Sequence, residues 1–267
     1  MRRFIPFIAK PPTVAVIRLH GVIAASARGG TLSDAALAPV IERAFSRGKP
    51  AAVALVINSP GGSPAQSSLI AARIRRLADE KTLPVHAFVE DVAASGGYWL
   101  ACAADDIWID DSSVVGSIGV ISASFGLQEA MARLGIERRV HTAGKDKSML
   151  DPFRPERPED VERLKAIQSQ IHDSFIAHVT ARRGERLAQG EDLFTGEFWV
   201  GQRAVELGLA DGVAHLVPKL KELYGEKVHL NTYGPRRSLF QRFGASLGAE
   251  ITAGIEDRAH WSRFGLS

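Results

Sequence analysis

The chain has 267 residues, of which 45% are hydrophobic, 24% are charged and 7% are aromatic. These proportions are ordinary for a globular protein and exclude collagen-like, disordered and low-complexity chains. Lys and Arg exceed Asp and Glu by only three, and no basic stretch interleaves with aromatic residues, so no nucleic-acid partner is expected. The length is sufficient for one large domain or two small ones.

The single cysteine, Cys102, excludes an internal disulfide and a Cys-rich metal site. It lies in an apolar run, so we expect a small buried side chain rather than a catalytic thiol. The N-terminal apolar segment 4–9 is shorter than the core of an export signal, and Pro6 interrupts it. No segment has the ~20 apolar residues of a transmembrane helix. We therefore expect a cytoplasmic protein, or one peripheral to the inner membrane.

Strands and helices alternate along the chain, which is typical of an α/β fold with a largely parallel sheet. Short apolar runs predict strands at 14–19, 51–57, 85–89, 107–109, 114–120 and 137–142. Apolar residues at helical spacing predict helices around 37–44 (with Ser33 as N-cap), 69–77, 94–104, 127–134 and 159–183. We expect two of these helices to bury particular residues: Leu69, Ile70, Ile74 and Leu77 in one, and Val161, Leu164, Ile167, Ile171, Phe175 and Val179 in the longest.

The composition changes after about Tyr233. We expect an N-terminal extension over 1–12, a main domain over 13–232 and a C-terminal amphipathic helical tail over 233–267. The apolar residues of this tail recur at helical spacing: Phe240, Phe243, Leu247, Ile251 and Ile255. The tail could dock on the body or on a neighbouring subunit, lie in a membrane surface, or remain disordered.

Two glycine-rich turns follow the ends of buried strands, at 58–62 (Asn-Ser-Pro-Gly-Gly) and at 93–98 (Ala-Ala-Ser-Gly-Gly-Tyr). Ligands bind at the carboxyl ends of the strands in open parallel sheets, and each turn leads into a helix whose first N–H groups have no partner. Two such turns side by side would supply the two backbone donors of an oxyanion hole. Ser95 is then a candidate nucleophile, although serine is also a common N-cap at such a position.

A serine nucleophile needs a base. The histidines that follow Ser95 are His141, His172, His178, His215 and His260. None has an adjacent acidic residue that would orient it, so a Ser-His-Asp triad stays open but unsupported. The alternative is a lysine whose pKa is lowered by burial, and Lys145 and Lys147 lie in a loop after a predicted strand. A lysine in such a loop is more often a solvated surface charge. The spacing alone does not decide whether either lysine is a catalytic base or such a surface charge.

Six segments resemble, in order, the signal peptide peptidase A family of Ser/Lys proteases, which have the crotonase/Clp-type fold of repeated ββα units. These segments are 16–23, 57–63, 94–101, 116–120, 144–147, and 194–196 together with 204–211. They extend over most of the chain, from about residue 13 to residue 220. The resemblance implies one compact Ser/Lys peptidase domain over 13–232.

The resemblance also implies residue roles. Ser95 matches the family's nucleophile, and Lys147, rather than the lysine two positions before it, matches the general base. Gly61 or Gly62, together with the N–H of Gly96, matches the oxyanion hole. The implied reaction is hydrolysis through an acyl-enzyme, with no metal or other cofactor.

The implied substrates are hydrophobic or extended peptides, such as signal-peptide remnants. The implied assembly is a ring-shaped homo-oligomer whose serine and lysine come from adjacent subunits, with a possible peripheral membrane contact. The sequence departs from the family in its N-terminal membrane anchor, which is missing or reduced to 4–8. Two alternatives keep the fold: a non-catalytic peptide-binding scaffold, and a crotonase-type acyl-CoA enzyme. The latter needs a carboxylate base, for which Glu90 and Asp91 are the nearest candidates.

Overall fold

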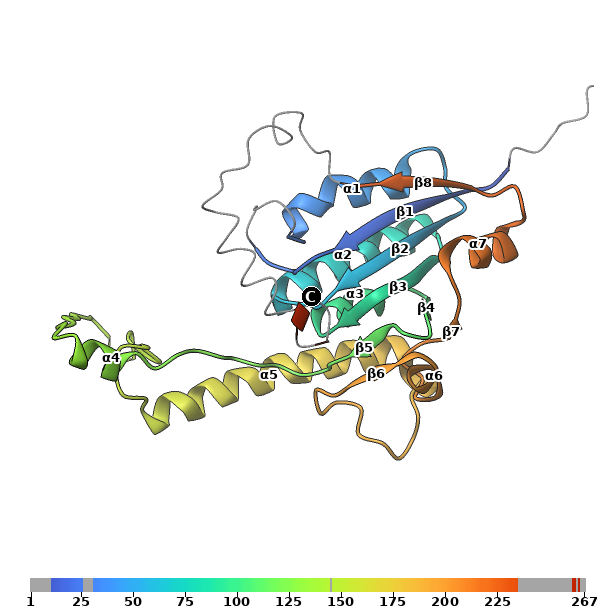
Figure 1. The fold of residues 1–267 in the computed structure, drawn as a ribbon. Helices are drawn as coiled ribbons and strands as arrows, with labels where there is room; N and C mark the ends of the chain where they lie inside the picture. The colour runs from blue at the N-terminus through green and yellow to red at the C-terminus, as the bar shows by residue number, and fades with distance from the viewer. Residues whose placement is uncertain (1–10, 26–30, 145, 235–260, 263, 265–267) are drawn as a thin grey trace, which may run out of the picture.

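The computed structural model describes residues 11–25, 31–144, 146–234, 261, 262 and 264, and these residues form an eight-stranded sheet with helices on both faces (Figure 1). The strands are β1 (Thr13–His20), β2 (Ala52–Ser59), β3 (Val85–Ala94), β4 (Asp106–Ile109), β5 (Val114–Gly116), β6 (Phe198–Val200), β7 (Gly212–Val213) and β8 (His229–Tyr233). The helices are α1 (Asp34–Ser46), α2 (Pro64–Lys81), α3 (Gly96–Ala101), α4 (Gln128–Arg133), α5 (Pro158–Arg183), α6 (Gly201–Glu206) and α7 (Leu216–Tyr224), with a 3-10 turn η1 (Gly184–Arg186).

The strand order is β6-β5-β3-β2-β1-β8, and β4 pairs with β3 and β7. Within the described residues every strand pair is parallel except β5 with β6. The central strands are apolar on both faces, as is typical of parallel sheets: α1, α2 and α3 cover one face, and α7 covers part of the other. The predicted α/β fold with a largely parallel sheet is confirmed.

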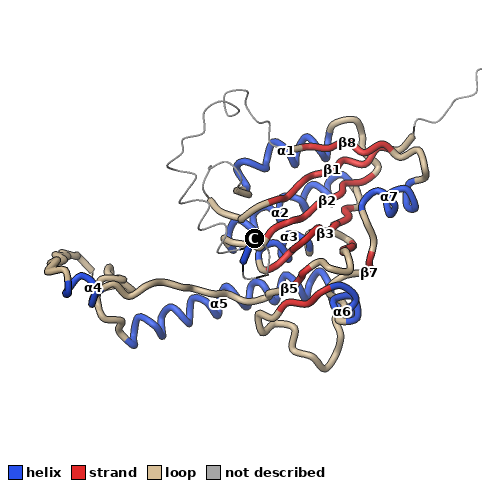
Figure 2. Tube along the Cα trace, in the orientation of Figure 1, coloured by secondary structure: helices blue, strands red, loops and turns tan. Residues whose placement is uncertain are grey.

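The larger core lies between the sheet and α1, α2, α3 and the last part of α5. Fully buried residues such as Ile17, Leu55 and Ile57 point into it from the central strands. A smaller apolar cluster lies on the opposite face, where Leu220 of α7 covers Phe88 and its neighbours. Figure 2 shows the same layers by secondary structure. The sheet therefore has one fully covered face and one face that α7 covers at one end.

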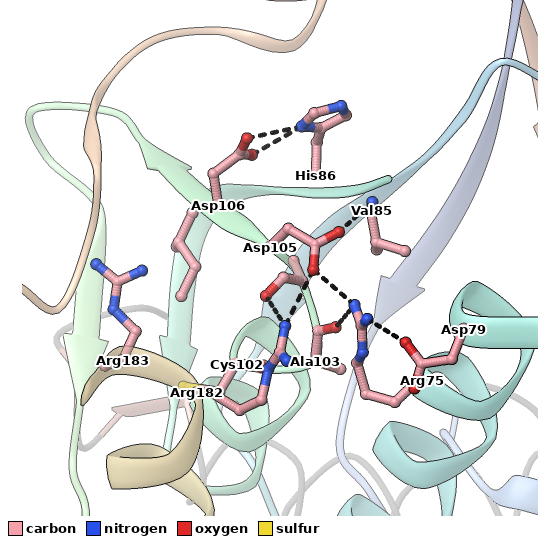
Figure 3. A network of polar contacts seen from close by, with 12 residues as sticks. Arg75, Asp79, Val85, His86, Cys102, Ala103, Asp105, Asp106, Arg182 and Arg183 are labelled. Carbon is pink, nitrogen blue, oxygen red and sulfur yellow. Dashed lines mark hydrogen bonds and ion pairs between the residues drawn. The ribbon is translucent and has the colours of Figure 1, made fainter. Parts of the chain in front are cut away.

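Asp105 ties three elements together at the end of α3 (Figure 3). Its carboxylate accepts hydrogen bonds from the N–H of Val85 at 2.9 Å, from Arg75 of α2 at 2.8 Å and from Arg182 of α5 at 3.1 Å. Arg182 also donates to the carbonyl of Cys102 at 2.9 Å. These charge-assisted bonds hold α2, α3 and the last turns of α5 against the start of β3.

An arm, defined here as residues 117–144 and 146–157 together with the first half of α5, extends away from the sheet with α4 at its far end (Figure 1). The predicted strand at 137–142 is wrong: this segment is loop on the arm, where no sheet edge offers partners for its backbone groups. The strand predicted at 114–120 ends at Gly116.

Two expectations about buried helix faces also need correction. In α5 only Phe175 and Val179 of the predicted stripe are buried, and Ile167 is 43% exposed, because the first half of the helix lies on the arm. In α2 Leu69 is 51% exposed, whereas the rest of the predicted set faces the core. By contrast, the predicted N-cap Ser33 is confirmed, since its side chain accepts a hydrogen bond from the N–H of Ala36.

The helix predicted at 94–104 is shorter in the structure, because β3 continues to Ala94 and Ser95 is the N-cap of α3. Cys102 is buried as predicted, and burial raises the pKa of its thiol to about 12.

Of the predicted helical tail, only Tyr233, Gly234 and residues 261, 262 and 264 are described, so the tail helix stays a prediction. Among the described helices none is long and apolar enough to cross a membrane.

Candidate active site

Ser95 lies on the sharp turn between β3 and α3. Its backbone has φ 52° and ψ −121°, a left-handed conformation that favours glycine and is strained for a serine. The N–H of Ser95 donates to the carbonyl of Gly116 at 2.8 Å, which fixes the turn against the end of β5. The hydroxyl makes no capping hydrogen bond to α3. A serine held on a strained strand-to-helix turn, with its hydroxyl free of the backbone, is typical of an activated nucleophile.

The two glycine-rich turns lie side by side, as the sequence predicts. A Cβ atom placed on Gly61 would be 2.7 Å from the nitrogen of Gly96 and 2.9 Å from the Cβ of Ser95. Gly61 has φ 99°, so both the backbone conformation and the close approach require glycine there. This contact places the backbone of the first turn directly against the serine of the second.

The hydrogen bonds of the first turn distinguish its two glycines. The N–H of Gly61 donates to the Oγ of buried Ser59 at 3.2 Å, and its carbonyl accepts from Ile23 at 2.8 Å. Gly62 is only half-buried, and within the described residues its N–H has no acceptor. The N–H of Gly96 begins α3 and is likewise outside the helical ladder. Among the described residues the N–H groups of Gly62 and Gly96 therefore have no acceptor, whereas the N–H of Gly61 has one.

The sequence alone did not separate Gly61 from Gly62, and it missed Ser59 altogether. Which of the two glycines keeps an N–H group without an acceptor depends on the direction of the Ser59 hydroxyl, and the spacing of residues in the sequence does not reveal that direction. The available signal was the serine within the Asn-Ser-Pro-Gly-Gly turn, because serine side chains commonly accept hydrogen bonds from backbone N–H groups two residues further along.

Lys147 is exposed and lies in the loop between α4 and α5, and Lys145 is outside the described residues. The loop is anchored to the first half of α5, where Asp146 pairs with Arg163 at 2.6 Å. Helix α3 contacts α5 further along, where Trp99 stacks on Phe175 with ring centroids 4.8 Å apart. A rise of 1.5 Å per residue separates these two contact points on α5 by about 18 Å along the helix axis. Within one chain, the structure does not bring Lys147 to Ser95.

The candidate histidines that the structure describes make no hydrogen bond to Ser95. His172 hydrogen-bonds to the carbonyl of Ile118 at 3.0 Å, and His178 to the carbonyl of Trp99 at 3.1 Å. Burial lowers the pKa of His178, which also stacks on the Trp99 ring. The others lie elsewhere: His141 is exposed on the arm, His215 pairs with Asp110 at 2.8 Å, and His260 is outside the described residues. No described histidine hydrogen-bonds to Ser95, so a Ser-His-Asp triad gains no support.

The carboxylates that a crotonase-type enzyme would use are already engaged. Glu90 pairs with Arg18 at 3.2 Å and with His20 at 2.9 Å. Asp91 accepts a hydrogen bond from the side-chain amide of Asn58 at 2.5 Å. These contacts give the carboxylates structural roles at the ends of the central strands. The described residues also contain no group of His, Cys, Asp and Glu side chains that could hold a metal ion.

A strained serine next to two glycine turns, on a crotonase/Clp-type fold, is the kind of arrangement that acyl transfer by a serine requires. The family model for peptidase family S49 matches residues 77–226, which is more than half of the chain. The chain therefore belongs to peptidase family S49. The resemblance to signal peptide peptidase A seen in the sequence is thereby confirmed.

Two curated relatives show how this chain relates to longer proteins. It is 46% identical to a protein of Brucella melitensis biotype 1 named as a Na(+)/H(+) antiporter, over 100% of the chain and 39% of that protein. It is 33% identical to the chloroplastic serine protease SPPA of Arabidopsis thaliana, over 76% of the chain and 31% of that protein. The chain thus spans less than half the length of these relatives, and the antiporter name belongs to the longer Brucella protein.

Solved structures confirm the fold. The chain is similar to the 1510-N membrane-bound stomatin-specific protease, solved as a Lys-to-Ala mutant in complex with a substrate peptide. That comparison has a TM-score of 0.51 and 16% identity and covers 91% of this chain and 99% of the other. A Ser-to-Ala mutant of the same protease gives a TM-score of 0.50 with 14% identity, over 85% of this chain and 99% of the other.

Proposed function

We propose that this chain is a serine peptidase with Ser95 as its nucleophile. The observation that carries the proposal is the strained Ser95 turn, packed directly against a second glycine turn that leaves the N–H of Gly62 free. Membership of peptidase family S49 supports the reaction class. The solved Ser-to-Ala and Lys-to-Ala mutants of the stomatin-specific protease are consistent with a serine and a lysine in this chemistry.

The proposed reaction is acyl transfer in two steps. A neutral Lys147 takes the proton of the Ser95 hydroxyl as the Oγ attacks the peptide carbonyl carbon. The negative charge that develops on the carbonyl oxygen is stabilised by the N–H groups of Gly62 and Gly96. The C–N bond then breaks, and the lysine returns its proton to the leaving amine. Water, deprotonated by the same lysine, hydrolyses the acyl-enzyme and regenerates Ser95.

We infer that Lys147 acts on the Ser95 of a second copy of the chain. Within one chain the arm holds Lys147 away from Ser95, as its anchor on α5 requires. The arm also exposes large apolar side chains that a subunit contact would bury: Ile121 (68%), Phe125 (82%), Leu134 (73%) and Ile136 (55%). Such a contact would also bury the exposed amine of Lys147, and removal from water favours the neutral form of an amine, which a general base needs.

The proposed substrate is an extended, mostly apolar peptide. Such a peptide would add a strand beside the glycine turns through backbone hydrogen bonds, with small or apolar side chains filling shallow pockets. The relative solved with a substrate peptide supports a peptide as ligand. We further propose that the peptidase domain spans 13–232, that it needs no cofactor, and that it acts in the cytoplasm or at the inner membrane surface.

The test is hydrolysis of a fluorogenic apolar peptide by the purified chain, alongside Ser95→Ala and Lys147→Ala and a measurement of native mass. We expect a multimer whose activity falls by at least about 10³-fold in both variants, as loss of a nucleophile or its base requires. Lys219→Ala, which removes a lysine of α7, is the matched control and should keep activity. Hydrolysis that persists in Ser95→Ala would refute the proposal, and a stable multimer without activity would favour the scaffold alternative.

A further inference from the structure

A small apolar cluster lies beside the Ser95 turn, on the sheet face opposite the main core. It consists of Val92 and Ala94 of β3 and Val114 of β5, and we call it the Val92 cluster. All three side chains are buried, and the cluster is separate from both the main core and the cluster under α7. Val92 pairs with Val114 in the β3–β5 register, and Ala94 pairs with Gly116. The cluster therefore lies on the same two strand ends that hold the backbone of Ser95.

Two aromatic side chains from the C-terminal end of the chain cover this cluster. Trp261 and Phe264 pack against it, and the Phe264 ring meets Phe198 of β6 edge to face, with ring centroids 5.4 Å apart. The N–H of Phe264 donates to the carbonyl of Trp261 at 3.0 Å, which holds these two residues close together. Figure 1 shows this segment in front of the sheet, at the end of β3.

The composition of the cluster explains why it accepts aromatic rings. Val92, Ala94 and Val114 are small, so they leave room for large side chains above the strands, and Phe198 adds an aromatic edge at the rim. In the described part of the chain, Trp261 and Phe264 are the partly buried apolar residues packed on this cluster. Neither of these two described residues belongs to one of the strands of the sheet or to a helix from α1 to α7. A separate peptide with the same two rings could make the same contacts.

We propose that the Val92 cluster and Phe198 form a docking site for a peptide segment with two aromatic side chains three residues apart. Trp261 and Phe264 of the chain itself occupy this site when no such peptide is bound. The effect of docking on hydrolysis rests on the proposed function. A substrate with this segment is held beside Ser95, and Trp261 and Phe264 of the chain compete with it. Docking itself requires no catalysis.

The test uses the full chain with Trp261→Ala and Phe264→Ala combined, which empties the site. The probe is a synthetic, fluorescently labelled peptide of residues 258–267, and its binding is followed by fluorescence anisotropy. We expect the double variant to bind the probe at least about tenfold more tightly than the wild type, because a covalently linked competitor acts at a millimolar effective concentration. Leu223→Ala, at an exposed site on α7, should bind the probe as the wild type does.

Two further measurements make the inference refutable. Adding Phe198→Ala to the double variant should weaken probe binding about tenfold, because it removes an aromatic contact at the rim. A probe with both aromatic residues replaced by alanine should not bind. If the double variant does not bind the probe, or if it binds the alanine probe equally well, the docking site is refuted.

Repeating the binding measurement in a Ser95→Ala background separates this inference from the proposed function. Binding there, together with a wild-type chain that hydrolyses no peptide, would refute the peptidase proposal and leave the docking site standing. Hydrolysis that depends on Ser95 without any binding of the probe would refute only the docking site. Where both hold, the double variant should also hydrolyse peptides with aromatic residues three apart with a several-fold higher kcat/KM than the wild type.

Discussion

The N–H of Ser95 donates a hydrogen bond of 2.8 Å to the carbonyl of Gly116, and this bond joins the β3–α3 turn to the end of β5. Gly116 has φ 105°, and a Cβ atom there would be 2.8 Å from the ring of Trp199. Both ends of the bond thus have backbone conformations that favour glycine, but one of them is a serine. The neighbouring structure therefore maintains a strained backbone at the residue that we propose as the nucleophile.

The strain at Ser95 predicts an unusual order of stabilities. A non-glycine residue in this conformation costs about 1–3 kcal/mol, whereas the extra freedom of an unfolded glycine costs about 0.5–1 kcal/mol. Ser95→Gly should therefore unfold at a higher denaturant concentration than Ser95→Ala, although both lack activity. At exposed Ser68 in the interior of α2 the order should reverse, since alanine is favoured in helices. Equal stabilities of the two Ser95 variants would contradict the strain.

Ser59 should act as a positioning residue through Gly61. Ser59→Ala removes the buried acceptor of the Gly61 N–H and should lower the free energy of unfolding by about 1–3 kcal/mol. The shifted turn should lower kcat more than it raises KM, because the oxyanion donors act mainly on the transition state. Steady-state kinetics and urea unfolding, compared with Ser68→Ala as control, measure both effects. An unchanged kcat would exclude this role.

The ion pair between α1 and α2 predicts a pH dependence of stability. Hydrogen bonding to Arg73, at 2.7 Å, holds the pKa of Asp34 below its ordinary value. A depressed carboxyl pKa adds stability that is fully present above the unfolded pKa of about 3.9 and is lost as the pH falls through the folded pKa. Asp34→Asn should therefore cost about 1 kcal/mol at pH 7, and the difference from the wild type should shrink below about pH 4. A difference that does not change with pH would contradict this account.

Cys102 should be unreactive in the folded chain. It is fully buried, and burial raises the pKa of its thiol to about 12, so almost no thiolate is present at pH 8. A chromogenic disulfide reagent should react with the chain only in denaturant, where the thiol regains its ordinary pKa. Rapid reaction under native conditions would show that the core around α3 opens.

The sheet and the two glycine turns could be predicted from local patterns, because residues adjacent in the sequence determine both. Buried strands require continuous apolar runs, and Gly61 and Gly62 mark backbone conformations that other residues adopt at a cost. The arm could not be predicted in this way. The apolar spacing from Val161 to Ile171 resembles a core stripe, and only tertiary structure shows that this half of α5 leaves the sheet. The role proposed for Lys147 requires a contact with a second copy of the chain, which no local pattern encodes.

The central claim, that Ser95 and Lys147 of different copies form one site, is tested most directly by mixing two inactive variants. Ser95→Ala and Lys147→Ala are purified separately, dissociated and reassembled together, and peptide hydrolysis is measured against each variant reassembled alone. A shared site predicts recovery of about a quarter of wild-type activity in an equal mixture, because each site draws its serine and its lysine independently from the two pools. If the mixture stays as inactive as its components while its native mass shows mixed multimers, serine and lysine do not act across subunits.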